Sequence, residues 1–103
     1  MSVFLQSTLE IRAAGFAQFC QTMDEIVGIV EEVGWRLDGA YVQRTGRLHT
    51  VIDLWELEDF NHFDRGIQAI TGHARGEAIR AALADTVVSE TVVFASKAPY
   101  SRR

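Results

Sequence analysis

Residues 35–57 read WRLDGAYVQRTGRLHTVIDLWEL, and this stretch decides the fold. It contains two runs rich in aromatic and aliphatic residues, 35–44 and 47–57, separated only by Thr45 and Gly46. Two such runs joined by a short turn that contains glycine are typical of a β-hairpin. We therefore expect a pair of antiparallel strands in the middle of the chain.

The segments on either side of this hairpin predict a ferredoxin-like fold. Polarity alternates over 3–11, which predicts a strand, and apolar residues at helical spacing predict a long helix over 16–33. Acidic residues at 58–59 open a second helix, a short helix covers 74–84, and an apolar run predicts a last strand over 87–95. The resulting βαββαβ order is typical of an α+β domain with a four-stranded antiparallel sheet and helices on one face.

The apolar stripes of the helices define the expected core. The single cysteine of the chain, Cys20, lies within the apolar stripe of the first helix. We therefore expect it to be a buried small hydrophobic residue rather than a nucleophile. A lone cysteine also excludes an internal disulfide. The second helix has a stripe of four large residues, which are Phe60, Phe63, Ile67 and Ile70.

The composition predicts one domain, spanning residues 1–103, that stays in the cytoplasm. The chain has 103 residues, of which 48% are hydrophobic, and this fits a single domain. A net charge of −4 with scattered basic residues argues against nucleic acid as a partner. The N-terminal sequence lacks a signal-peptide pattern, and no apolar stretch approaches the ~18 residues of a membrane-spanning helix. We therefore expect no membrane association.

The sheet face that points away from the helices is the expected binding surface. The first strand turns its apolar residues toward the helices, which leaves Phe4, Gln6, Thr8 and Glu10 on the other face. On the third strand, we expect that same outer face to carry Val51, Asp53 and Trp55. A face that mixes large apolar and polar groups is poorly suited to water, so we expect a second copy of the chain to cover it. This predicts a homodimer around a partly enclosed cavity; the alternative is a monomer that tolerates the surface.

The register of the hairpin decides which residues reach this cavity. A two-residue turn pairs Val42 with His49 and Asp38 with Asp53, and thereby places Asp38, His49 and Asp53 on the face of Arg36 and Trp55. A slip of one residue would bring Gly39 and Tyr41 there instead, because parity decides the face of a strand. Both registers remain open at this point.

Asp53 and His49 are the candidate catalytic residues. A carboxylate in an apolar cavity has a raised pKa and can exchange protons near neutral pH, which suits Asp53 beside Trp55. His49 is a second candidate acid or base. The candidate substrate contacts are Gln6, Thr8, Glu10, Tyr41 and Trp55. Alternatively, the polar residues set strand register or pair across the dimer, and Trp55 packs at the subunit contact.

No metal site and no organic cofactor is expected. The three histidines, His49, His62 and His73, do not stand at metal-ligand spacings. The glycines are dispersed and form no phosphate-binding loop, and no flavin or nicotinamide signature is present.

Four segments resemble the NIPSNAP family of the dimeric α/β-barrel superfamily. They are STLEIRAAGFAQF, the hairpin with Gly39, Tyr41 and Gly46, the LEDF sequence after Trp55, and SETVVFASKAPYS. Two departures stand out: Ala13-Ala14-Gly15 replaces a commoner proline–glycine turn, and Asp53 stands where members often have histidine. The resemblance implies a dimer with a central cavity but no settled activity, because related barrels include cofactor-independent monooxygenases, isomerases, cyclases and haem-handling proteins.

Two functional hypotheses follow. The first is a small enzyme, without an organic cofactor, that acts on a hydrophobic or aromatic molecule by proton transfer or oxygenation. The second is a non-catalytic domain that binds a small molecule or haem, or that serves in assembly. A packed, solid cavity would speak against both pocket-based readings.

Overall fold

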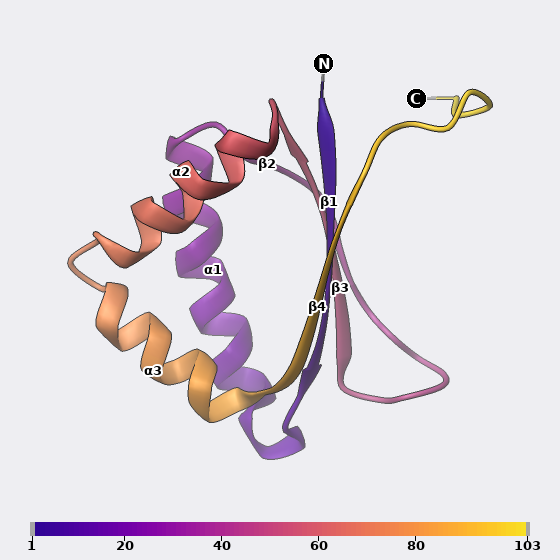
Figure 1. The fold of residues 1–103 in the computed structure, drawn as a ribbon. Helices are drawn as coiled ribbons and strands as arrows, with labels where there is room; N and C mark the ends of the chain where they lie inside the picture. The colour runs from indigo at the N-terminus through magenta and orange to yellow at the C-terminus, as the bar shows by residue number, and fades with distance from the viewer. Residues whose placement is uncertain (1, 103) are drawn as a thin grey trace.

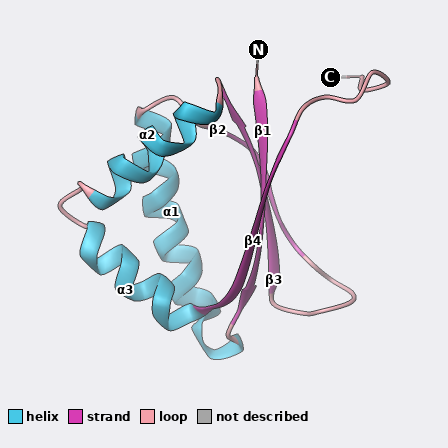
Figure 2. Cartoon of the chain, viewed as in Figure 1, coloured by secondary structure: helices cyan, strands magenta, loops and turns pink. Residues whose placement is uncertain are grey.

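The protein folds into two layers, an antiparallel sheet and a layer of helices (Figure 1). The structure is a computed structural model that describes residues 2–102. Its strands are β1 (Val3–Ile11), β2 (Arg36–Val42), β3 (Thr50–Leu57) and β4 (Val87–Ala95). Its helices are α1 (Phe16–Glu32), α2 (Phe60–Thr71) and α3 (Gly76–Thr86), preceded by a 3-10 turn, η1 (Ala13–Gly15). All helices lie on one side of the sheet (Figure 2), which confirms the predicted ferredoxin-like α+β fold.

The strand order explains why the helices share one face. The order is β2-β3-β1-β4, with every neighbouring pair antiparallel. The connection through α1 joins β1 to β2, which are separated by β3, and the connection through α2 and α3 joins β3 to β4, which are separated by β1. Crossovers of this kind are right-handed, so both return over the same face of the sheet.

The register of the two central strands places Asp53 and Trp55 under the helices. Leu5 pairs with Trp55, and Ser7 pairs with Asp53. All four side chains are buried. The prediction that Asp53 and Trp55 lie on the outer face is therefore wrong. Side chains on directly paired residues point to the same face of the sheet. Because β1 turns its apolar residues toward the helices, the β3 residues that pair with them also point toward the helices.

The hairpin also differs from its predicted register. Val42 pairs with Val51 rather than with His49, and residues 43–49 form a loop instead of a two-residue turn. The loop turns through Gly46 (φ 75°) and His49 (φ 60°), both left-handed conformations. A bulge between Leu37 and Gly39 then removes Asp38 from the pairing. Arg36, two positions before Asp38, faces the outer side of the sheet, where it is ion-paired with Glu56.

The core is organised around Trp35, the residue directly before β2. Its indole Nε1 donates a hydrogen bond of 2.8 Å to the backbone oxygen of His62 on α2. The His62 ring is fully buried: Nδ1 accepts from the Glu58 amide at 2.9 Å, and Nε2 lies 2.6 Å from the Val33 oxygen. Because Nδ1 accepts, Nε2 carries the proton and donates to Val33. His62 therefore has a structural role, joining α2 to the end of α1.

Two expectations about the helix stripes are wrong. Cys20 is exposed, because the buried stripe of α1 consists of Phe19, Thr22, Ile26 and Val30. On α2, Phe60 and Ile67 remain 64% and 38% exposed. The apolar face of α2 thus does not close completely onto the sheet. None of the helices described for residues 2–102 is both long and apolar enough to cross a membrane.

The contact between Gly66 and Trp35 yields a test of this core. A Cβ atom at Gly66 would lie 2.3–2.5 Å from indole atoms of Trp35, so Gly66→Ala must displace the ring. We expect a loss of roughly 1–3 kcal/mol in the free energy of unfolding, measured by urea denaturation. The matched control is Gly28→Ala on α1, where a Cβ meets nothing within 4 Å. This variant should gain about 0.5–1 kcal/mol, and equal effects of the two substitutions would contradict the packing.

Candidate functional site

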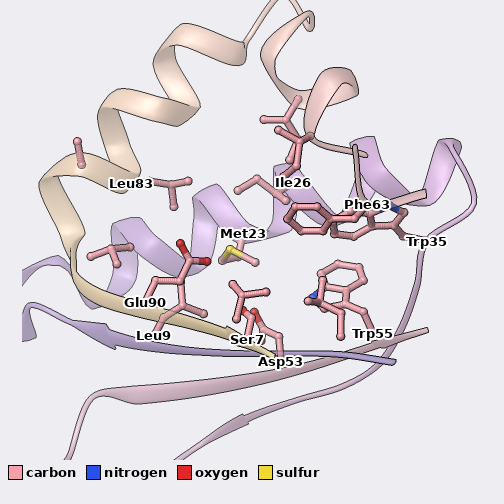
Figure 3. Close-up of a pocket in the computed structure, with 16 residues that line it drawn as sticks. Ser7, Leu9, Met23, Ile26, Trp35, Asp53, Trp55, Phe63, Leu83 and Glu90 are labelled. Carbon is pink, nitrogen blue, oxygen red and sulfur yellow. The ribbon is translucent and has the colours of Figure 1, made fainter. Parts of the chain in front are cut away.

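A cavity of about 460 Å³ lies between the sheet and the helices of a single chain (Figure 3). This volume is in the range of small-molecule pockets. Most of its lining is aliphatic or aromatic, and the residues are Leu5, Ser7, Leu9, Met23, Ile26, Trp35, Asp53, Trp55, Phe63, Ile67, Ile70, Leu83, Ala84, Val87, Glu90 and Val92. The partly exposed Ile67 of α2 is among these residues, so α2 does not fully cover this space.

Three polar side chains from adjacent strands lie on the sheet side of this cavity. They are Ser7 on β1, Asp53 on β3 and Glu90 on β4. Ser7 pairs directly with Asp53, and Glu90 pairs with Leu9, two positions further along β1. Figure 3 shows Ser7 and Asp53 together on the sheet between Leu9 and Trp55, with Glu90 on the side of Leu9. The three groups are all hydrogen-bond acceptors, and only the Ser7 hydroxyl is also a donor when the carboxyls are ionised.

Burial alters the chemistry of Asp53. Its side chain is 3% exposed, and Oδ2 is buried without a hydrogen-bond partner among residues 2–102. Burial raises the pKa of Asp53 to about 6, and the nearby Glu90 carboxylate contributes to raising this pKa. The carboxyl group can therefore take up and release a proton close to neutral pH.

Aromatic side chains form the end of the cavity away from Glu90 (Figure 3). Trp35 stacks on Phe63, with ring centroids 5.7 Å apart, and meets the edge of Trp55 at 5.3 Å. The Phe63 ring in turn contacts Phe94 on β4. Rings that are fixed by each other and by the Trp35–His62 hydrogen bond form a rigid, flat-sided wall, which suits a hydrophobic or aromatic ligand.

The cavity opens beside β4. Glu90 is exposed although it lines the cavity, and Val92 on the same strand is 40% exposed. Ile67 on α2 also lines the cavity and is partly exposed. A ligand that enters here passes a charged carboxylate before it reaches buried Asp53.

The remaining predicted site residues lie elsewhere. Tyr41 and the three polar residues of β1 occupy the outer face of the sheet, because their partners on β3 are Ile52, Leu54 and Thr50 rather than residues of the cavity. His49 lies in the loop before β3, where its ring contacts Phe16 with centroids 6.0 Å apart. The prediction that Gln6, Thr8, Glu10, Tyr41 and His49 share one cavity with Asp53 and Trp55 is therefore wrong.

Two of these outer residues border a separate polar groove. Thr8 and Glu10 lie beside Arg47 and Thr50, and Arg47 is ion-paired with Glu10 at 2.5 Å. The Thr50 hydroxyl is buried there without a hydrogen-bond partner in the described part of the chain. Because this ion pair already satisfies the charges of the groove, the groove is a poor place for acid–base chemistry.

Ser7, Glu90, Trp35 and Phe63 are site residues that sequence reasoning missed. The sequence does mark Glu90 as unusual, because it is the one charged residue in the last strand, Val87–Ala95. Trp35 follows the glycine at the end of the first helix, but nothing in that position indicates a cavity. Within residues 2–102, no group of three or more His, Cys, Asp or Glu side chains is arranged to hold a metal ion.

Comparison with solved structures identifies the fold. A NIPSNAP domain protein from Burkholderia xenovorans superposes with a TM-score of 0.78 at 23% identity, with all of both chains covered. A NIPSNAP family protein from Agrobacterium tumefaciens gives 0.82 at 18% identity, covering 97% of this chain and 89% of the other. This chain has the NIPSNAP fold.

The NIPSNAP fold extends to proteins with other names. A protein from Caulobacter crescentus, named as a candidate antibiotic biosynthesis monooxygenase, has a TM-score of 0.74 at 15% identity and covers 94% of this chain and 90% of its own. No protein-family sequence model matches the chain, and no curated protein sequence matches it either. At these identities the likeness concerns the fold alone.

The burial of Asp53 predicts a pH-dependent stability. Its folded-state pKa of about 6 lies above the ordinary value of 3.8, so folding favours the protonated form. The wild type should therefore lose stability as the pH rises from about 4 to about 6, and Asp53→Asn should not. Between pH 4 and pH 7 we expect the variant to gain roughly 1–3 kcal/mol relative to the wild type, with little change at higher pH.

Urea denaturation at fixed protein concentration, repeated across this pH range, measures the difference. Asp64→Asn is the matched control, because Asp64 is an exposed aspartate on α2. Its stability should follow that of the wild type at every pH. A constant difference between wild type and Asp53→Asn from pH 4 to pH 8 would contradict the assignment.

Proposed function

We propose that this protein is a NIPSNAP-like enzyme that needs no organic cofactor and acts on a hydrophobic or aromatic small molecule by proton transfer. One observation carries the proposal: Asp53 is buried, unpartnered at Oδ2 within residues 2–102 and raised in pKa to about 6, at the floor of an apolar cavity. A strongly perturbed carboxylate in a cavity of ligand size is a candidate general base.

The lining residues divide the work between binding and chemistry. The aromatic wall of Trp35, Trp55 and Phe63 holds the hydrophobic body of the substrate and excludes water. The Asp53 carboxylate accepts a proton from an acidic C–H or O–H group of the substrate and returns it to the same or another position. A pKa near 6 keeps most of this carboxylate ionised at pH 7 while leaving it basic enough to accept the proton.

Cofactor-free oxygenation is the second reaction class that this site supports. Removal of a proton from a CH₂ group of the substrate by Asp53 leaves an electron-rich carbanion. Dioxygen adds to this carbon, and the proton returns to give a hydroperoxide, which loses water and leaves a carbonyl group on the substrate. The fold shared with the candidate monooxygenase from Caulobacter crescentus is a fold-level analogy in favour of this class. The proton-transfer step at Asp53 is common to both reactions.

The alternative function is a non-catalytic binding domain. In its favour, the cavity is mostly apolar and contains only three polar side chains among its described lining residues, so it resembles a carrier site as much as a reaction site. The residues do not fit haem well: among the same lining residues, Met23 is the only one of a type that ligates haem iron. A smaller organic ligand fits the cavity better.

Hydrogen–deuterium exchange tests the proton-transfer proposal directly, because it reports removal of a proton whichever reaction follows. Bicyclic aromatic ketones such as 2-tetralone are incubated in D₂O with the protein, and loss of the α-proton signal is followed by ¹H NMR. We expect exchange to be faster with wild type, to rise with pH through about 6, and to fall by about 100-fold or more in Asp53→Asn.

Asp64→Asn again serves as the control and should exchange the ketones at the wild-type rate. If none of these bicyclic ketones exchanges faster with wild type than with Asp53→Asn, Asp53 is not a general base. A retained ligand found by native mass spectrometry in that case would favour the carrier alternative.

We propose in addition that two copies pair through the outer face of the sheet, in a domain that spans residues 1–103 and acts in the cytoplasm. Among residues 2–102, the exposed large hydrophobic side chains on this face include Tyr41, Leu54 and Val93. Their strands place them on the same side as Phe4 and Gln6. Apolar groups that gather on one sheet face are typical of a surface covered by a partner.

Light scattering after size exclusion tests the pairing. Wild type should elute as a dimer, whereas Leu54→Glu should shift toward the monomer, because a charge at the centre of the face has no partner. The control is Gln68→Glu on the exposed side of α2, which should stay dimeric. A wild-type monomer at high protein concentration would disprove the pairing, but not the cavity, because one chain forms the whole cavity.

A further inference from the structure

Glu90 is a charged group in the cavity that the proton-transfer proposal does not use. Its side chain lines the opening, and its carboxylate is close enough to raise the pKa of Asp53. Figure 3 shows Glu90 beside Leu9 and Met23, above the strands that carry Ser7 and Asp53. Two carboxylates therefore face one apolar space.

No positive charge among the described lining residues balances these two carboxylates. The sixteen lining residues include no lysine, arginine or histidine. The ion pairs formed within residues 2–102 join other acidic residues, such as Glu10, Glu25 and Asp85, to arginines outside the cavity. The charged neighbour that shifts the pKa of Asp53 is Glu90, which has the same sign. Like charges in an apolar site repel each other, and a cation between or beside them would relieve this repulsion.

The two carboxylates differ in ways that assign them different tasks. Asp53 is buried at the floor of the cavity, whereas Glu90 is exposed at its opening. An exposed carboxylate keeps its contact with water, so it can pair with a cation at the opening without the cost of burying its charge. The buried Oδ2 of Asp53, unpartnered within residues 2–102, shows in addition that this end of the cavity lacks a donor that a ligand can supply.

We propose that the ligand is a compact aromatic amine, whose protonated amino group is held by Glu90 while its rings lie against Trp55 and Phe63. This inference rests on the proposed function, because it places the ligand in the same cavity and leaves Asp53 free to accept a proton. The arrangement disfavours carboxylate and phosphate ligands, since they would add a third negative charge. A neutral alcohol or ketone lacks the charge that Glu90 attracts.

Three compounds with one ring system test the charge preference. Isothermal titration calorimetry at pH 8 compares 2-aminotetralin, 2-tetralol and tetralin-2-carboxylic acid as ligands of the wild type. We expect the amine to bind about tenfold more tightly than the alcohol, as for a hydrogen bond between charged groups, and the acid to bind more weakly than both. Equal affinities of amine and alcohol would overturn the inference.

Substitution of the anchoring group then tests the role of Glu90. Glu90→Gln should lose the preference for the amine and keep the affinity for the alcohol, whereas Glu77→Gln, at an exposed glutamate on α3, should behave as wild type. An amine preference that persists in Glu90→Gln would overturn the assignment of Glu90. The calorimetry and the ketone exchange test the two proposals separately. If amine and alcohol bound equally but Asp53→Asn still exchanged ketones more slowly than wild type, the amine preference would be wrong and the proposed function would stand. If none of the three compounds bound, the amine inference would fall, and the ketone exchange would still decide the proposed function.

Discussion

The antiparallel register of β1 and β3 is the constraint on which the rest of the structure depends. Leu5 opposite Trp55, and Leu9 opposite Val51, are buried pairs on either side of the Ser7–Asp53 pair. Each such apolar side chain contributes about 1.5–3 kcal/mol when fully buried. The raised pKa of Asp53 corresponds to a cost of roughly 1–3 kcal/mol for its ionised form. The flanking apolar pairs outweigh this cost, and therefore the fold keeps a carboxylate under the helices.

The cavity persists because rigid aromatic groups hold α2 away from the sheet. The hydrogen bond from Trp35 to His62, and the bond from the His62 ring to Val33, fix the first turn of α2 relative to β2 and to the end of α1. The bond from the Glu58 amide to the same ring holds the ring in place. Gly66 allows the indole to approach the helix backbone, and Phe63 stacks on the same ring. Further collapse of the helix would require these rings to move, so Ile67 remains at the edge of an open space. The contacts that stabilise the aromatic cluster therefore also keep the cavity open.

The sequence predicts the fold well and the site only in part, for physical reasons. Helical and strand periods are local, so the βαββαβ order and the hairpin could be read directly. The face on which Asp53 lies depends on the pairing of β3 with β1, and both faces of β3 mix apolar and polar residues. The left-handed conformation of His49 lengthens the hairpin loop without a glycine at that position to signal it. Ser7 and Glu90 were missed because a single polar residue in a strand is more often solvated than turned into a cavity.

Substitutions can change one face of the sheet without changing the other, so the cavity can acquire a new function while the outer surface stays the same. The outer face carries its charged residues in ion pairs, Arg36 with Glu56 and Arg47 with Glu10, around exposed apolar groups. The inner face carries two carboxylates, with no cation among the lining residues, against a wall supplied by the same chain. Adjacent residues of one strand point to opposite faces, so a substitution at an inner position alters the ligand without touching the outer surface. A change of Asp53 or Glu90 to histidine or glutamine would therefore redirect the chemistry of the cavity while the proposed pairing surface stayed the same.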